Sequence, residues 1–259
     1  MTRPSRFLLT RPADQSRSLA SVLREAGIEP VVVPAIAILP PRSYEALDRA
    51  IEELETYDWV LFTSANGVRA FRDRLASSRR GRPLPAALGW AVAGPHTARS
   101  LAALGVRRIW SPTAASGLTA ASELPAGAGA RVLWVRGNLA STAVARRLRA
   151  RALTVHDVVG YRTVEAPESS RGPLAAAWRN GLDGVVLASA SAAHGFAKLA
   201  HDVGVDRPPD GFLIVAIGPA TAAAAAEAGW APQLVARDHT TAGIVEAITE
   251  RRESGAASV

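Results

Sequence analysis

The sequence has 259 residues, of which 48% are hydrophobic, and a formal net charge of +7 at pH 7. It contains no cysteine, which excludes disulfides, thiolate nucleophiles and cysteine-bound metals. No run approaches the roughly 18 apolar residues of a membrane span, and no apolar signal segment precedes the first expected strand, so we expect a cytoplasmic protein without membrane segments.

The basic residues are almost all arginine, since Lys198 is the single lysine. No aromatic residues are interleaved with the arginine clusters, as a platform for single-stranded nucleic acid would require. We therefore do not expect nucleic acid as a partner. An acidic small molecule fits the positive charge better.

In the first half of the chain, short apolar runs alternate with amphipathic stretches. Residues 58–71 carry four apolar residues followed by Thr-Ser-Ala-Asn-Gly, which predicts a buried strand, a turn and a helix capped by a polar side chain. The prolines in and around 36–41 predict an edge strand or linker there, since proline cannot donate to a central ladder. The other expected elements are strands at 6–10, 31–33, 89–93 and 108–110, helices at 15–26, 44–55, 95–105 and 118–123, and a loop at 77–85.

The second half repeats this order of elements. The expected strands lie at 132–135, 155–162 and 212–216, with a further strand and turn at 183–191. The expected helices lie at 140–151, 174–180, 221–228 and 241–251. A break rich in proline, serine and glycine is expected at 166–173. Regular alternation of apolar strands with helices predicts parallel sheets covered by helices on both faces.

The chain is an internal duplication with an offset of about 125 residues. Residues 58–71 match 183–196, 7–38 match 132–163, and 90–110 match 215–234. Two copies of one unit therefore fill the chain. If the chain crosses between domains at its two punctuated segments, 36–41 and 163–167, each domain combines pieces of both copies, and a two-stranded hinge joins them.

Several short motifs follow one another in a characteristic order. They are Arg11-Pro12, Thr63–Val68 (TSANGV), Gly94–Ala98 (GPHTA), Val132–Gly137 (VLWVRG), Gly160–Thr163 (GYRT), Gly218–Ala222 (GPATA) and Thr240–Gly243 (TTAG). With this set, nearly the whole chain resembles the uroporphyrinogen-III synthase family. One departure is Ala188, where the family often has threonine.

The resemblance implies two Rossmann-like parallel-sheet domains joined by a two-stranded hinge. The implied domains are 1–35 with 168–259, and 41–162, with the linkers at 36–40 and 163–167. It also implies a lyase of tetrapyrrole (heme) biosynthesis that needs neither cofactor nor metal. This enzyme cyclises hydroxymethylbilane in a cleft between the domains, with loss of water and inversion of ring D.

The implied substrate carries eight carboxylates, and hydrogen-bond donors follow the expected strands at their carboxyl ends, where open α/β sheets bind ligands. Helix N-termini and hydroxyl-rich turns favour anions. The candidate substrate-binding residues are Arg11, Thr63, Ser64, Asn66, Thr97, Arg136, Ser189, Ser191, Gly218 and Thr221. The same hydroxyls are also typical of helix caps, and the two arginines are also compatible with solvated surface charges.

Tyr161 is the candidate catalytic residue, because the resemblance places a tyrosine near the hinge at this motif. Departure of hydroxide needs a proton donor, and a phenol of pKa about 10 can supply a proton or a hydrogen bond. The alternative is a strand tyrosine that only packs its ring.

Two other functions remain open from the residues alone. One is a non-catalytic, two-domain binder of a small polyanionic ligand. The other is a dinucleotide enzyme, although no G-x-G-x-x-G follows any expected strand. No histidine pair has the spacing of a metal site, so no metal is expected. A monomer is the expected state.

Overall fold

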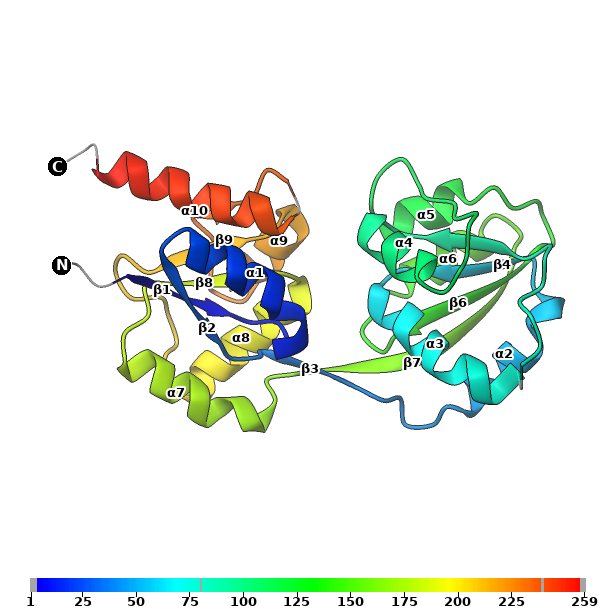
Figure 1. The fold of residues 1–259 in the computed structure, drawn as a ribbon, viewed down its shortest axis with the longest axis horizontal. Helices are drawn as coiled ribbons and strands as arrows, with labels where there is room; N and C mark the ends of the chain where they lie inside the picture. The colour runs from blue at the N-terminus through cyan, green and yellow to red at the C-terminus, as the bar shows by residue number, and fades with distance from the viewer. Residues whose placement is uncertain (1–3, 80, 239, 257–259) are drawn as a thin grey trace. The chain divides into compact units, whose positions relative to one another are not determined.

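The computed structural model describes residues 4–79, 81–238 and 240–256, with only the backbone from 252 on. Its chain divides into two compact units. The first unit combines the residues up to Ala37 with those from Val164 on, and the second spans Ile38–Thr163 (Figure 1). Whether each unit folds independently as a domain stays a prediction.

The first unit is built on a five-stranded sheet in the order β10-β9-β8-β1-β2. Every neighbouring pair in it is parallel. The strands are β1 (Ser5–Leu9), β2 (Ile28–Val32), β8 (Gly184–Leu187), β9 (Leu213–Ala216) and β10 (Leu234–Val235). Pro30 lies in β2, which is an edge strand, so its missing N–H leaves no gap in a central ladder.

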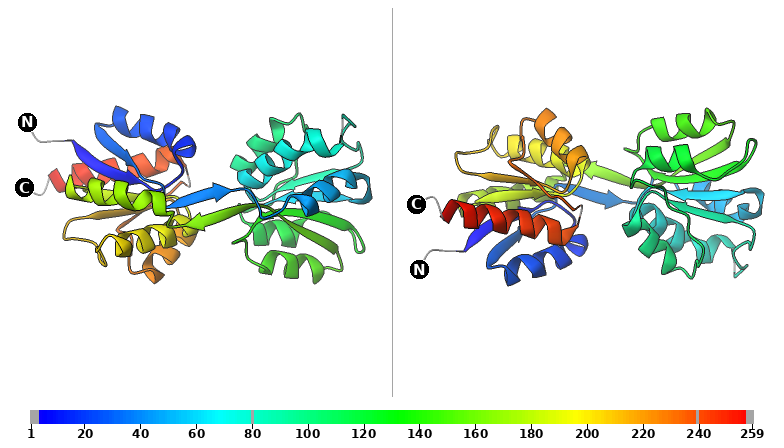
Figure 2. Two further views of the ribbon diagram at one scale, coloured as in Figure 1. Left: turned by 90° about the horizontal axis from the view of Figure 1, so that it is seen from below. Right: turned by 90° about the horizontal axis from the view of Figure 1, so that it is seen from above.

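Helices cover both faces of this sheet (Figure 2). One face packs on α7 (Arg171–Arg179), α8 (Ala190–Asp202) and α9 (Pro219–Glu227). The other face packs on α1 (Ala13–Glu25) and α10 (Thr241–Ala256). Two apolar clusters thus sandwich the strands, as a parallel sheet requires.

The second unit has the same plan, with the strand order β3-β7-β6-β4-β5. The pairs β4·β5, β4·β6 and β6·β7 are parallel. The strands are β3 (Ile36–Leu39), β4 (Trp59–Phe62), β5 (Gly89–Val92), β6 (Arg131–Gly137) and β7 (Thr154–Glu165), and the outer ends of β3 and β7 cross the boundary between the units. One face packs on α2 (Glu45–Glu52), α3 (Ala65–Arg79) and α4 (Pro95–Ala102), and the other on α5 (Gly117–Glu123) and α6 (Ala143–Arg149).

Each sheet mixes strands from the two copies of the duplication. β1, from the first copy, pairs with β8 of the second, and β6, from the second copy, pairs with β4 of the first. The predicted α/β class with two parallel sheets is confirmed. None of the helices in the described part of the chain combines the length and apolar character needed to cross a bilayer.

Four local predictions were wrong. Helix α3 runs on to Arg79, where a loop from 77 was expected, and Arg80 lies outside the described residues. The expected strand at 108–110 is only an isolated bridge from Trp110 to Ala91. Helix α6 begins later than expected because a turn closes from Ala140 N–H to the Gly137 carbonyl.

The fourth concerns the break expected at 166–173. This segment holds the 3-10 helix η2 (Glu168–Ser170) and the start of α7, because Pro173 falls in the first helical turn, where proline is tolerated. A further 3-10 helix, η1 (Leu54–Thr56), follows α2. The sequence pattern also missed the two-residue strand β10.

Candidate functional site

The carboxyl edge of the second unit's sheet brings predicted residues from three strands together. Strand β4 ends at Phe62 and passes through Thr63 and Ser64 into α3. Ser64 caps that helix, since its Oγ accepts the Gly67 N–H at 3.2 Å. The same Oγ lies 2.9 Å from the Tyr161 hydroxyl on β7. Two candidates that are 97 positions apart in the sequence are thus hydrogen-bonded.

The phenol of Tyr161 sits in a confined environment. Burial raises the pKa of Tyr161, and the hydrogen bond from Ser64 offsets part of that rise. The phenol therefore stays protonated at neutral pH and able to donate.

Gly137 supports the ring from the neighbouring strand. A Cβ placed on Gly137 would lie 2.7 Å from Tyr161 Cζ and 2.9 Å from its hydroxyl oxygen, so only glycine fits without moving the ring. The β6–β7 register shifts between Arg136 and Gly137, which makes Tyr161 the partner of Gly137. This bulge places the phenol against bare backbone.

Arg136 is held close to the same edge by an ion pair. Its Nη2 lies 2.8 Å from the Asp157 carboxylate, and its guanidinium lies 5.6 Å from the Trp134 ring centre. Burial alone would raise the pKa of Asp157, but hydrogen bonds and charge from Arg136 and Arg149 outweigh it and lower the pKa. The carboxylate of Asp157 therefore already offsets part of the positive charge of Arg136.

The remaining candidates of this unit, Thr63, Asn66 and Thr97, lie just after a strand or in the first turn of a helix. Thr63 Oγ1 accepts the Trp134 indole N–H at 3.2 Å. Asn66 lies in the first turn of α3. Thr97 lies in the first turn of α4 and is only 6% exposed.

The first unit has an equivalent corner at the end of β8. Ser189 caps α8 by accepting the Ala192 N–H at 3.1 Å, and its Oγ lies 3.2 Å from that of Ser191. Gly218 precedes Pro219 at the start of α9, and Thr221, in the first turn, is 5% exposed. These residues stand at helix starts, where backbone N–H groups are free to bind anions.

Arg11 follows β1 at this corner and differs from Arg136. Among the described side chains, no carboxylate forms an ion pair with it. Burial lowers the pKa of its guanidinium, which nevertheless stays charged at neutral pH. Arg11 thus offers a positive charge that no carboxylate in the described part of the chain neutralises.

Sequence reasoning missed three residues of the second unit's corner, namely Asp157, Trp134 and Asn138. A charged residue inside the predicted strand 155–162 was the available signal for Asp157, because a carboxylate on a partly buried strand needs a partner. Trp134 and Asn138 had no such signal, since their partners lie on other strands.

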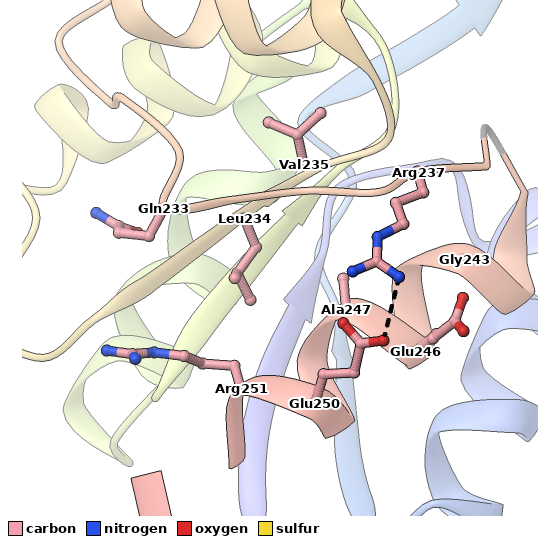
Figure 3. A pocket seen from close by; sticks show the side chains of 9 residues that line it. All are labelled: Gln233, Leu234, Val235, Arg237, Gly243, Glu246, Ala247, Glu250 and Arg251. Carbon is pink, nitrogen blue, oxygen red and sulfur yellow. Dashed lines mark ion pairs between the residues drawn. The ribbon is translucent and has the colours of Figure 1, made fainter. Parts of the chain in front are cut away.

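A pocket of about 360 Å³ lies elsewhere in the first unit, between β10 and α10 (Figure 3). Its charged groups include Arg237 and Glu250, which are 3.6 Å apart. None of the predicted site residues lines it. Among the side chains that the structure describes, no group of three His, Cys, Asp or Glu is arranged to hold a metal ion.

Comparison with known proteins identifies the family. The family model described as "Uroporphyrinogen-III synthase HemD" matches residues 17–246. The chain belongs to the uroporphyrinogen-III synthase family. The resemblance stated from the sequence motifs is confirmed.

Relatives within the uroporphyrinogen-III synthase family span the chain. A uroporphyrinogen-III synthase of Synechococcus elongatus is 30% identical over 250 residues, covering 94% of this chain and 94% of the relative. A porphyrin biosynthesis protein HemD of Ruminiclostridium josui is 30% identical over 223 residues, 85% of this chain but 44% of the relative.

Solved structures of the family share the fold. Uroporphyrinogen III synthase of Thermus thermophilus superposes with a TM-score of 0.69 at 18% identity, covering 96% of this chain and 99% of the other. The Helicobacter pylori protein gives 0.57 at 13% identity, covering 96% and 100%. At these identities the likeness supports the two-sheet fold of the family and not the roles of single residues.

Proposed function

We propose that this chain is a lyase that closes the linear tetrapyrrole hydroxymethylbilane to uroporphyrinogen III, with loss of water and inversion of ring D. Membership of the uroporphyrinogen-III synthase family supports the reaction. The Ser64–Tyr161 hydrogen bond at the carboxyl edge of the second sheet is the observation that supports the catalytic site.

In this proposal Tyr161 assists departure of the hydroxyl group on ring A. The C–O bond breaks, the leaving oxygen takes a proton from the phenol, and water departs. Ring D then attacks through its substituted position to form a spiro intermediate. The bond from that carbon to its original methylene bridge breaks, and the bridge bonds to the free α-position of ring D, which leaves ring D inverted. The proton lost as the last pyrrole regains aromaticity restores the phenol, so the net loss is one water.

Ser64 directs the phenolic proton. Its Oγ accepts the Gly67 N–H, so its own hydrogen is free to point at the Tyr161 oxygen. In that arrangement the Tyr161 hydrogen points away from Ser64, toward a substrate oxygen. The hydrogen bond also stabilises the phenolate that forms as the proton leaves.

Each unit carries donors that suit the carboxylates of the substrate. Arg11 supplies a positive charge that no carboxylate among the described side chains pairs with. The helix starts that carry Ser64, Thr97, Ser189 and Thr221 each favour a nearby anion by typically about 0.3–1 kcal/mol, so the starts within a unit together help to order a flexible polyanion. Thr63, Asn66, Arg136, Ser191 and Gly218 complete the proposed binding set.

No observation favours the non-catalytic binder or the dinucleotide enzyme, and the family match extends over most of the chain. The monomeric state, the cytoplasmic location and the absence of a cofactor belong to this proposal. Size-exclusion chromatography and fractionation of the producing cell test the first two.

The test of the reaction is the identity of the product isomer. Purified protein is incubated with enzymatically generated hydroxymethylbilane, and the oxidised product is separated by chromatography. We expect the type III isomer. Formation of only the type I isomer, which arises spontaneously, would contradict the proposed function.

A further inference from the structure

Asn138 bonds to β7 at Tyr161 itself and at Thr163, two residues further on. Its backbone N–H donates to the Tyr161 carbonyl at 3.2 Å. Its side chain accepts the Thr163 N–H at 2.7 Å and donates from Nδ2 to the Thr163 carbonyl at 3.2 Å. The amide of Asn138 therefore pairs with Thr163 as a peptide group of a neighbouring strand would.

This pairing occurs where the regular ladder ends. The β6–β7 register shifts at Arg136/Gly137, and β6 stops at Gly137, while β7 continues to Glu165. Without a substitute partner, the backbone that carries Tyr161 would lose its neighbour on the β6 side just after the bulge, and only β3 would remain beside β7. The Asn138 side chain extends the pairing of β7 past Tyr161 as far as Thr163.

The position of the phenol depends on small displacements. The ring lies so close to Gly137 that no Cβ fits there, and its hydroxyl is 2.9 Å from Ser64. A shift of about 1 Å in the Tyr161 backbone would lengthen that hydrogen bond beyond its useful range, and misplacement of this size can reduce a rate by up to about 100-fold.

We propose that Asn138 is a positioning residue, which acts through the backbone of Tyr161 to hold the phenol in its reactive place. The inference rests on the proposed function of Tyr161 and assigns no contact with substrate to Asn138. The exposed side chain of Asn138 has no core role, so its removal leaves the packing of the unit intact.

Gln233 provides a matched control in the first unit. The side-chain Oε1 of Gln233 accepts the Ile214 N–H at 2.8 Å, and the backbone N–H of Gln233 donates to the Ile214 carbonyl at 3.1 Å. This exposed side chain also extends a ladder, near the start of β9 and away from the strand ends that carry the candidate residues.

The kinetic experiment compares Asn138→Ala with Gln233→Ala and combines Asn138→Ala with Tyr161→Phe. We expect Asn138→Ala to lower kcat about tenfold, Gln233→Ala to leave kcat within about twofold, and Asn138→Ala to have no further effect when Tyr161 is already phenylalanine. An equal loss from Asn138→Ala in both backgrounds would overturn the inference, while formation of the type III isomer by the unaltered protein would still support the proposed function.

A second readout does not depend on activity. The chain has three tyrosines, and in protein labelled with ¹³C on its tyrosine rings the Tyr161 signal is the one that Tyr161→Phe removes. We expect Asn138→Ala to shift that signal and Gln233→Ala to leave it in place. An unchanged Tyr161 signal in Asn138→Ala would overturn the positioning role even if the protein makes only the type I isomer.

Discussion

The two units carry the same corner with different chemistry. Ser64 and Ser189 each cap the helix that follows a buried strand, so the cap belongs to the fold and was copied with it. Only Ser64 also meets a phenol, because the residue 125 positions before Tyr161 is Ile36. The comparison teaches that equivalent helix caps are no sign of equivalent roles.

The two arginines differ for a similar reason. Asp157, which pairs with Arg136, has Val32 as its equivalent in the other copy, so Arg11 lacks that carboxylate. In one corner a carboxylate shared with Arg149 holds Arg136, while in the other no carboxylate among the described side chains pairs with Arg11. We expect the first unit to contribute mainly binding and the second mainly chemistry.

A close approach that only glycine allows behaves differently. It is present in both units, but the glycine stands on a different element in each. In the second unit, Gly160 on β7 faces Ala70 on α3, and in the first, Gly195 on α8 faces Ala35. A Cβ on Gly195 would lie 2.1 Å from the Ala35 carbonyl oxygen, and one on Gly160 would lie 2.9 Å from Val135 Cγ1. Each crossing needs one glycine, and either partner can supply it.

The largest expected effect comes from removing the hydroxyl group of Tyr161, which only the second unit's corner carries. We expect Tyr161→Phe to lower kcat about 100-fold without abolishing turnover, because the loss of a general acid typically costs at least this factor while substrate folding remains. Single-turnover formation of the type III isomer measures it. Turnover at the level of the unaltered protein would remove Tyr161 from the site.

The next largest effect is on KM, and it distinguishes Arg11 from Arg136. We expect Arg11→Met to raise KM about tenfold and Arg136→Met only about threefold, because Arg136 already shares its charge with Asp157. Initial rates over a range of hydroxymethylbilane concentrations give both values. The reverse order would show that the ion pair does not decide which arginine binds.

The caps provide a smaller and closely matched contrast. We expect Ser64→Ala and Ser189→Ala each to lower stability by about 1 kcal/mol through the lost cap. Only Ser64→Ala should also lower kcat, by about fivefold, since only Ser64 bonds to Tyr161. Urea unfolding and saturating kinetics measure the two quantities, and an equal fall in kcat for both variants would contradict the asymmetry.

The smallest expected effect is a shift in one pKa. The hydrogen bond from Ser64 lowers the pKa of Tyr161 against the larger effect of burial. We therefore expect Ser64→Ala to move the ionisation of Tyr161 to higher pH, while Ser189→Ala leaves it unchanged. Spectrophotometric titration, with Tyr161→Phe as the reference that identifies the signal, measures this shift, and a move to lower pH would show that Ser64 acts in another way.

Local patterns were sufficient for the parts of the fold that depend on neighbours in sequence. The apolar run and hydroxyl-rich turn at 58–71 predicted β4, the Ser64 cap and α3, and the copy at 183–196 predicted the same for α8. The α/β class followed from the alternation of such runs. The strand expected at 108–110 failed because its pairing depends on one bridge to Ala91.

The site was less accessible to sequence reasoning because its geometry comes from distant residues. Ser64 and Tyr161 were both candidates, yet nothing local indicated that they bond. Asp157 acts through Arg136 on the neighbouring strand β6, and Asn138 acts on β7 beyond a register shift that no periodicity reveals. The substrate contacts of the candidates remain predictions.

Proton donation by Tyr161 is tested most directly by the dependence of kcat on pH in the unaltered protein and in Tyr161→Phe. The protonated phenol is the active form, and burial raises its pKa, so activity should persist through neutral pH and fall only in the alkaline range as the phenol ionises. The account predicts that this alkaline fall is absent from the lower, flat profile of Tyr161→Phe. The same fall in both proteins would contradict it.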